Sequence, residues 1–189
     1  LSNSVDWAIG PLRGGVMITG TLAHPLINGN IRLTDGAMKW RALKNPVQNM
    51  QMAIEFKDDQ MTINNCSGWM GKGSYTLTGS TLITGGGFDR YAFDLQLSNL
   101  EADSEFLQGP LNGHFSLTTG EIFGHQLPKL SGNLELENVT DSIPSLPEGE
   151  TELPNVILDL GLTAKNKVRL YSPFLYDLNI KGSAHFTGT

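Results

Sequence analysis

The sequence predicts an all-β fold, an elongated and mostly antiparallel sheet with little or no helix. Apolar and polar residues alternate with period two along most of the 189 residues, and glycine is frequent, at 22 residues. A strand unit is also repeated: Pro25 to Gly36 returns, one residue shorter, as Pro110 to Gly120. Each copy has a proline, an Asn-Gly pair, an alternating strand and a closing glycine, which is typical of a sheet that grows by adding strands.

The alternation predicts about a dozen strands, each with one apolar face. In chain order, their apolar residues are Val16 and Ile18; Ile31 and Leu33; Met50, Met52, Ile54 and Phe56; Met61 and Ile63; Tyr75 and Leu77; Tyr91, Phe93, Leu95 and Leu97; Phe115 and Leu117; Leu134 and Leu136; Val156, Leu158, Leu160 and Leu162; Val168 and Leu170; Leu178 and Ile180; Ala184 and Phe186.

Turn residues separate these segments, so that most strands are expected to be antiparallel neighbours. The predicted turns are Asn28-Gly29, Asp35-Gly36, Lys57 to Gln60, Gly71 to Gly73, Gly85 to Gly87, Asn112-Gly113, Ser131-Gly132 and Lys165 to Lys167. The best helical candidate, Asn99 to Gln108, is at most a short turn before Gly109-Pro110. Residues 138–154 contain three prolines and several glutamates, and we expect a solvated loop there within a single domain, residues 1–189.

Charge and cysteine content exclude several classes of protein. The 13 Lys and Arg residues are scattered and are outnumbered by 19 Asp and Glu residues, so nucleic acid is not an expected partner. Cys66 is the single cysteine, and no internal disulfide is available. The sequence has no apolar run long enough to span a bilayer and no N-terminal signal, and we interpret it as a piece of a longer protein.

No local constellation predicts catalysis, and we expect neither an enzyme, nor a metal site, nor a cofactor. Residues 68–74 lack the spacing of a phosphate-binding loop, and the four histidines stand alone. The acidic residues fall in turns or on polar strand faces, and Cys66 has no neighbouring base.

The apolar face is therefore the remaining candidate site. In a two-sheet sandwich it would be a dry core, whereas the repetition and the inward positions of Met50, Met52 and Met61 favour an open groove. The alternative is a closed β-sandwich or β-helix adhesin or carbohydrate-binding domain, with Trp7, Trp40 and Trp69 on its surface. The predicted groove residues are Ile31, Leu33, Met50, Met52, Ile54, Phe56, Tyr75, Leu77, Tyr91, Phe93, Leu95, Leu97, Phe115, Leu117, Leu134, Leu136, Val156, Leu158, Leu160, Leu162, Val168, Leu170, Leu178 and Ile180.

Phrases near the C-terminal end resemble the TamB family of envelope proteins. The first two are LDLGL, residues Leu158 to Leu162, and NKVRLYSP, residues Asn166 to Pro173. The third is Leu178 to Thr189, which follows the pattern L-x-I-x-G-x-A-x-F-x-G-T. Gly20 to Gly29 is similar to a recurrent phrase of that family.

This resemblance implies a U-shaped apolar groove, often called a β-taco, in the periplasm of a double-membraned bacterium. It implies a relationship to AsmA-like and bridge-like lipid carriers. The parent protein would shield phospholipid acyl chains for transport between the inner and outer membranes and would support outer-membrane biogenesis. Its expected contacts are a TamA-type outer-membrane barrel and, through an N-terminal anchor, the inner membrane, both made by parts that this chain lacks.

Overall fold

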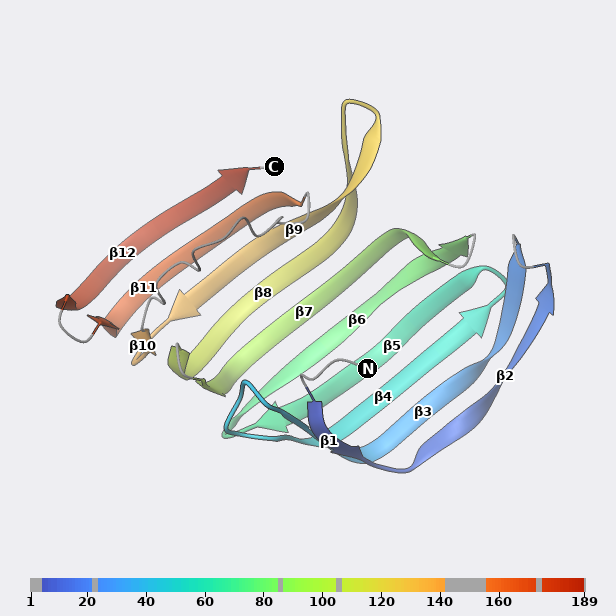
Figure 1. Ribbon diagram of the computed structural model, residues 1–189, viewed down its shortest axis with the longest axis horizontal. Helices are drawn as coiled ribbons and strands as arrows, with labels where there is room; N and C mark the ends of the chain where they lie inside the picture. Colours follow the sequence, from blue (N-terminus) through green and yellow to red (C-terminus); the bar gives the residue numbers. More distant parts are fainter. Residues whose placement is uncertain are drawn as a thin grey trace.

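The computed structural model describes residues 5–21, 24–84, 87–104, 107–141, 156–172 and 175–188. Within these ranges the chain forms twelve strands of one sheet and no helix, which confirms the predicted all-β class (Figure 1). The strands are β1 (Val5–Ile9), β2 (Leu12–Gly20), β3 (Pro25–Trp40), β4 (Val47–Lys57), β5 (Gln60–Met70), β6 (Gly73–Thr84), β7 (Gly87–Asp103), β8 (Leu107–Ile122), β9 (His125–Leu136), β10 (Thr140–Asp141), β11 (Ile157–Ser172) and β12 (Tyr176–Gly188). No helix in the described part is long and apolar enough to cross a membrane.

The strands occupy ten hydrogen-bonded positions in the order β1-β3-β4-β5-β6-β7-β8-β10-β11-β12. Two positions are shared, since β1 and β2 pair with successive parts of β3, and β9 and β10 lie one after the other between β8 and β11. All pairs are antiparallel except those of β11 with β9 and β10, which are parallel. Most neighbours in sequence are therefore antiparallel neighbours in the sheet, as expected from the turn residues between predicted strands.

Short turns join the hairpins where the backbone needs a left-handed residue. Asp58 (φ 57°) lies in the β4–β5 turn and Gly71 (φ 62°) in the β5–β6 turn, both within predicted turns. The β8–β9 hairpin turns at Phe123 and Gly124, which both have positive φ, as a two-residue turn between antiparallel strands requires. Phe123-Gly124 is not among the turns predicted above.

Several other predicted turns are wrong, because they lie inside long strands. Asn28-Gly29 and Asp35-Gly36 belong to β3, Asn112-Gly113 to β8, and Ser131-Gly132 to β9. Lys165 to Lys167 form a bulge in β11, so the two predicted strands on either side of it are one. Leu178 to Phe186 likewise belong to the single strand β12. Of Gly85 to Gly87, the first two lie outside the described residues, and Gly87 begins β7.

The helical candidate is also wrong in its described part, because Asn99 to Asp103 end β7 and Leu107 and Gln108 begin β8. The predicted loop 138–154 is not solvated at its beginning, as the burial of Val139 shows. Val139 is fully buried, and its carbonyl accepts a hydrogen bond from the Arg169 amide at 2.8 Å. Residues 142–154 of the loop lie outside the described residues.

Left-handed residues inside the strands bend the sheet. Asp35 in β3, Asn49 in β4, Asn99 in β7 and Lys167 in β11 have φ between 48° and 55°, and each lies where the pairing register shifts. A bulge of this kind bends its strand and increases the local twist. Figure 1 shows the result, with neighbouring strands curving together along the sheet.

Candidate functional site

Paired residues on one face form apolar rows that cross the whole sheet. Directly opposed residues of neighbouring strands share a face, so the register identifies each row. The central row runs through all ten positions as Leu12, Leu33, Met52, Cys66, Leu77, Leu95, Phe115, Gly132, Leu160 and Phe186.

Two further rows flank it on the same face. One also crosses the full sheet, as Gly14, Ile31, Ile54, Ile63, Gly79, Phe93, Leu117, Leu130, Leu158 and Gly188. The other covers seven positions, as Gly68, Tyr75, Leu97, Gly113, Leu134, Leu162 and Ala184. These three rows, with the apolar residues beyond them on the same side, are called the apolar face below.

The opposite face is polar. One of its rows reads Ser67, Thr76, Gln96, His114, Asn133, Gly161 and His185. Polar contacts lie along it: Asp94 is 3.4 Å from His114 Nε2 and accepts a hydrogen bond from Ser116, and Asp159 is 2.8 Å from His185 Nε2. This face is suited to water, and the sheet is therefore amphipathic across its thickness.

The apolar face is covered only in part. Among the described hydrophobic residues, only Val47, Met70, Ala102, Leu136, Val139, Ala164 and Val168 are buried. Most of the remaining apolar-face residues are half-buried, and those near the sheet edges are exposed, including Leu12, Leu178 and Phe186. No second layer of described strands packs on this face, because all twelve belong to the one sheet.

A hollow of about 370 Å³ lies in the apolar face between β3 and β7. Its lining includes Met38 and Trp40 from β3 and Leu95 and Leu97 from β7. In a flat sheet β3 and β7 would lie four steps, about 19 Å, apart. Side chains from both strands line one hollow because the sheet curves toward its apolar face.

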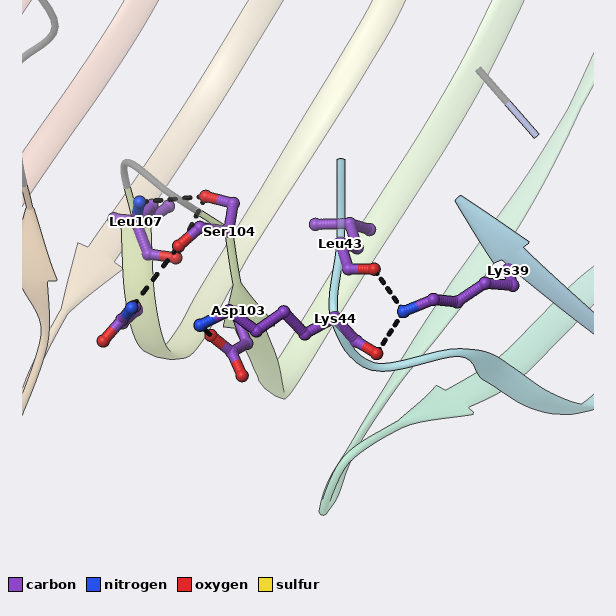
Figure 2. Close-up of polar contacts among 7 residues, drawn as sticks. Lys39, Leu43, Lys44, Asp103, Ser104 and Leu107 are labelled. Atoms are coloured by element: carbon purple, nitrogen blue, oxygen red, sulfur yellow. Dashed lines mark hydrogen bonds and ion pairs between the residues drawn. The ribbon is translucent and has the colours of Figure 1, made fainter. Parts of the chain in front are cut away.

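Leu43 of the β3–β4 loop, residues 41–46, closes one end of this hollow. Polar contacts hold the loop in place (Figure 2). The Lys44 amide donates to the Asp103 carbonyl at 2.8 Å, and Lys44 Nζ lies 2.8 Å from the Asp103 carboxylate. Lys39 Nζ donates to the Leu43 carbonyl at 2.5 Å and also to the Lys44 carbonyl. The contacts of Lys44 tie the loop to the end of β7, and those of Lys39 tie it to β3.

The tether carries the loop from the start of β4 to the end of β7. Lys44 lies three residues before β4, and its amide is bound to the carbonyl of Asp103, the last residue of β7. The loop therefore passes the ends of β5 and β6 on this side of the sheet.

A second apolar region lies at β8–β12 and is packed rather than hollow. Leu136, Val139, Ala164 and Val168 form a buried cluster, and Val139 and Val168 are fully buried. Val139 lies between β9 and β10, and Leu111, Leu134, Leu162 and Ile180 pack around the cluster. The apolar face thus differs along its length, with an open hollow on one side and a covered cluster on the other.

All the predicted groove residues that have a paired partner lie on the apolar face. Fifteen of them form its rows: Ile31, Leu33, Met52, Ile54, Tyr75, Leu77, Phe93, Leu95, Leu97, Phe115, Leu117, Leu134, Leu158, Leu160 and Leu162. Phe56 and Tyr91 extend the face toward the β4–β5 turn, through Met61 and Thr81. Val168 pairs with Ile180 and Leu170 with Leu178, and Val156 is half-buried just before β11.

The hollow and the cluster each bring together only part of that set. Met50, Tyr75, Leu77, Leu95 and Leu97 line the hollow. Leu134, Leu136, Leu162, Val168 and Ile180 belong to the cluster or pack against it. Leu158 and Leu178 join neither group and are exposed.

Sequence reasoning missed much of the hollow's lining. Met38, Trp40, Leu43, Val47, Cys66, Met70 and Leu100 were not among the predicted groove residues. Met38 and Trp40 do alternate, and this signal was overlooked because Asp35-Gly36 was interpreted as the end of a strand. Leu43 lies in a loop, where no strand periodicity could have identified it.

Cys66 and Tyr75 supply the few polar atoms near the floor of the hollow. Burial raises the pKa of the Cys66 thiol, and a hydrogen bond from Tyr75 offsets part of that rise. Burial also raises the pKa of the Tyr75 hydroxyl, with a smaller contribution from Cys66. Both groups are thus neutral at physiological pH, which suits a site that binds uncharged, apolar ligands.

The described residues contain no group of three or more metal-ligating side chains. What the geometry offers is one extended apolar face, hollowed between β3 and β7 and backed by a polar face. No protein-family description, curated protein or solved structure matches this chain.

Proposed function

We propose that the apolar face binds phospholipid acyl chains, as a periplasmic segment of a TamB-like envelope bridge that carries lipid between the inner and outer membranes. The observation that carries this proposal is the pair of apolar rows that cross all ten strand positions. Nine steps between ten strands give a path of about 43 Å. That length exceeds the roughly 15 Å of hydrocarbon in one leaflet, so more than one lipid fits along it.

The energetics favour a shielded route for lipid. Exposing an acyl chain of sixteen carbons to water costs on the order of 12 kcal/mol, at about 0.8 kcal/mol per methylene. Contact with Leu77, Leu95 and Phe115 replaces that water with apolar surface. The open side of the face leaves the head group hydrated, so its charge is not buried.

The resemblance to the TamB family supports the proposed location and partners. In this proposal the parent protein is anchored in the inner membrane, lies in the periplasm and meets a TamA-type outer-membrane barrel. Its contribution would be to outer-membrane biogenesis. The chain itself contributes the groove, and it is not proposed to be an enzyme.

The closed-sandwich alternative is less well supported. The described strands form one unclosed sheet, and Trp40 does not share a face with Trp69. Trp40 lines the hollow, whereas Trp69 lies next to the hollow residue Met70 in β5 and therefore points to the other face. A flat aromatic platform for sugars is thus not formed by Trp40 and Trp69.

Mass spectrometry of an organic extract from the folded protein tests lipid binding directly. We expect phospholipid to co-purify in stoichiometric amounts with protein isolated from a double-membraned bacterium. Protein that is folded and carries no lipid, and that acquires none from phospholipid vesicles, would contradict the proposal.

Charge placed on the apolar face tests the role of the rows. Leu95→Asp with Leu158→Asp introduces two carboxylates on two full rows, and we expect loss of co-purifying lipid with strand content retained. The matched control is Gln96→Asp with Thr187→Asp, which adds the same charges on the polar face. Circular dichroism checks folding in both, and equal lipid content in the two double variants would count against the proposal.

A further inference from the structure

We infer that the hollow between β3 and β7 is a terminal site that holds the methyl end of one acyl chain, with the lipid head group directed away from the β3–β4 loop. The inference rests on the proposed function and adds to it a position and an orientation. Three features of the hollow support it: its size, its lining and its closed end.

The size and lining fit the end of a hydrocarbon chain. Comparison with an apolar cavity of about 150 Å³ that takes up benzene suggests that about 370 Å³ accommodates on the order of a dozen carbon atoms. No charged residue lines the hollow; its lining residues are Met38, Trp40, Leu43, Val47, Met50, Cys66, Met70, Tyr75, Leu77, Leu95, Leu97 and Leu100. The thiol of Cys66 and the hydroxyl of Tyr75 are both held neutral by burial. A charged head group would find no partner inside.

The end beneath the β3–β4 loop is closed. Val47 and Met70, which line the hollow there, are 3% and 4% exposed. The loop's polar groups are occupied by its own neighbours: Lys39 Nζ binds the carbonyls of Leu43 and Lys44, and the Lys44 amide binds Asp103 (Figure 2).

Orientation follows from these two facts. A phosphate drawn into the hollow would lose its water without gaining charged partners, because no charged residue lines it, and this is costly for a charged group. A methyl group there loses only contact with water. The chain therefore enters with its methyl end toward Leu43 and Trp40, and the head group lies further along the strands, in the direction of the β4–β5 turn.

Trp40 provides a reporter inside the hollow. In a variant with Trp7→Phe and Trp69→Phe, Trp40 is the single tryptophan. Lysophospholipids brominated near the methyl end, at mid-chain or next to the head group quench tryptophan fluorescence on contact. We expect the largest loss of Trp40 fluorescence with bromine at the methyl end and the smallest with bromine next to the head group.

A filling variant gives the matched comparison. Cys66→Phe places a ring in the hollow, and we expect it to reduce quenching by the methyl-end probe. Leu178→Phe enlarges a side chain on the same face in β12, outside the hollow, and we expect quenching to be retained. A second readout needs no substitution at Cys66: bound lysophospholipid is expected to protect this single thiol from monobromobimane.

The outcomes separate this inference from the proposed function. Equal quenching by all three probes, or the largest loss with bromine next to the head group, would overturn the inferred orientation while still supporting acyl-chain binding. If the lysophospholipid binds but neither quenches Trp40 nor protects Cys66, the hollow is not its binding site. Acyl-chain binding elsewhere on the apolar face would still be supported. Absence of any binding in equilibrium dialysis would overturn both.

Discussion

Glycines inside the strands make room for aromatic side chains on the apolar face. Gly79 has φ +149°, and a Cβ there would lie 2.5 Å from Cδ1 of Phe93 and closer still to the Ala92 carbonyl oxygen. Tyr75 covers Gly68 in a similar way, with its ring 2.9 Å from an added Cβ. Such glycines are therefore part of the packing of the face, although in sequence they look like turn residues.

Gly79→Ala is accordingly expected to destabilise the protein by about 1–3 kcal/mol, the usual cost of overpacking, because Phe93 and the backbone must shift. The control is Gly15→Ala in β2, where an added Cβ meets nothing within 4 Å. Urea unfolding followed by circular dichroism measures both. A near-neutral effect of Gly79→Ala would contradict the assigned packing of Phe93.

The Cys66 thiol is expected to react slowly at neutral pH, because the thiolate is the reactive form and burial raises the pKa of Cys66 above its ordinary value of 9.0. Monobromobimane labelling across pH measures this, with urea-unfolded protein as the reference. Tyr75→Phe removes a hydrogen bond that lowers this pKa, so the profile should move to still higher pH. A folded-state profile equal to that of the unfolded chain would show that Cys66 does not face the hollow.

The raised pKa of Cys66 also makes the stability of the fold depend on pH. The native thiol holds its proton more tightly than the unfolded one, so its stabilising contribution is complete below the ordinary thiol pKa. That contribution is lost as pH rises through the raised native pKa.

The repeated strand unit has a shared role at the level of the element. In its first copy, the Asn28 side chain lies beside the left-handed Asp58: its oxygen accepts from the Asp58 amide at 3.3 Å. In the second, the Asn112 side-chain oxygen accepts from the amide of the left-handed Asn99 at 2.9 Å. Each Asn thus supports a left-handed residue on a neighbouring strand or turn instead of making a turn of its own.

These elements show what the sequence could and could not predict. Alternation in Tyr91 to Leu97 correctly identified β7 and its apolar side, because period two directly reports the faces of a strand. Asn28-Gly29 was misinterpreted because Asn-Gly favours a hairpin turn locally, whereas Gly29 lies inside β3, where an added Cβ would clash with the Gly15 carbonyl oxygen of β2. Pairing across strands is nonlocal, and a single sequence does not display it.

The hollow was predictable only in part, for a related reason. Tyr75, Leu77, Leu95 and Leu97 carry the alternation and were predicted to line a groove. Leu43 reaches the hollow through the loop contacts of Lys44 with Asp103, 59 residues away in sequence. No local pattern encodes such a contact.

The β3–β4 loop leads to a prediction about local rather than global stability. The Lys44–Asp103 ion pair is largely exposed on the lysine side, 63%, so Lys44→Gln should lower the free energy of unfolding by less than about 1 kcal/mol. Hydrogen exchange at the Leu43 and Lys44 amides should nevertheless accelerate, because the loop loses one of its tethers.

Lys165→Gln serves as the control for that measurement. It removes a comparably exposed ion pair with Glu135, at 2.6 Å, on β9 and β11. Exchange at Leu43 and Lys44 should then be unchanged. Equal acceleration in both variants would mean that the Lys44 side chain does not specifically hold the loop.

At the scale of the whole molecule, we expect local stability against unfolding to increase from the edges of the sheet to its middle. Each strand contacts chiefly its neighbours in the sheet, so β1, β2 and β12 are supported on one side only. Native-state hydrogen exchange should be fastest in β1, β2 and β12 and slowest in β5 to β8. Uniform protection across all strands would indicate one cooperative unit instead.

The unbroken rows restrict how a chain of this kind can change during evolution. Side chains alternate between the two faces, so gaining or losing one residue within β6 would turn Leu77 outward and Thr76 inward along the rest of that strand. Length changes are therefore tolerated at the hairpin tips or as whole strand pairs. Related proteins should therefore differ in the length of the sheet by whole hairpins. Each strand would then keep its hydrophobic side chains on one face and its hydrated side chains on the other.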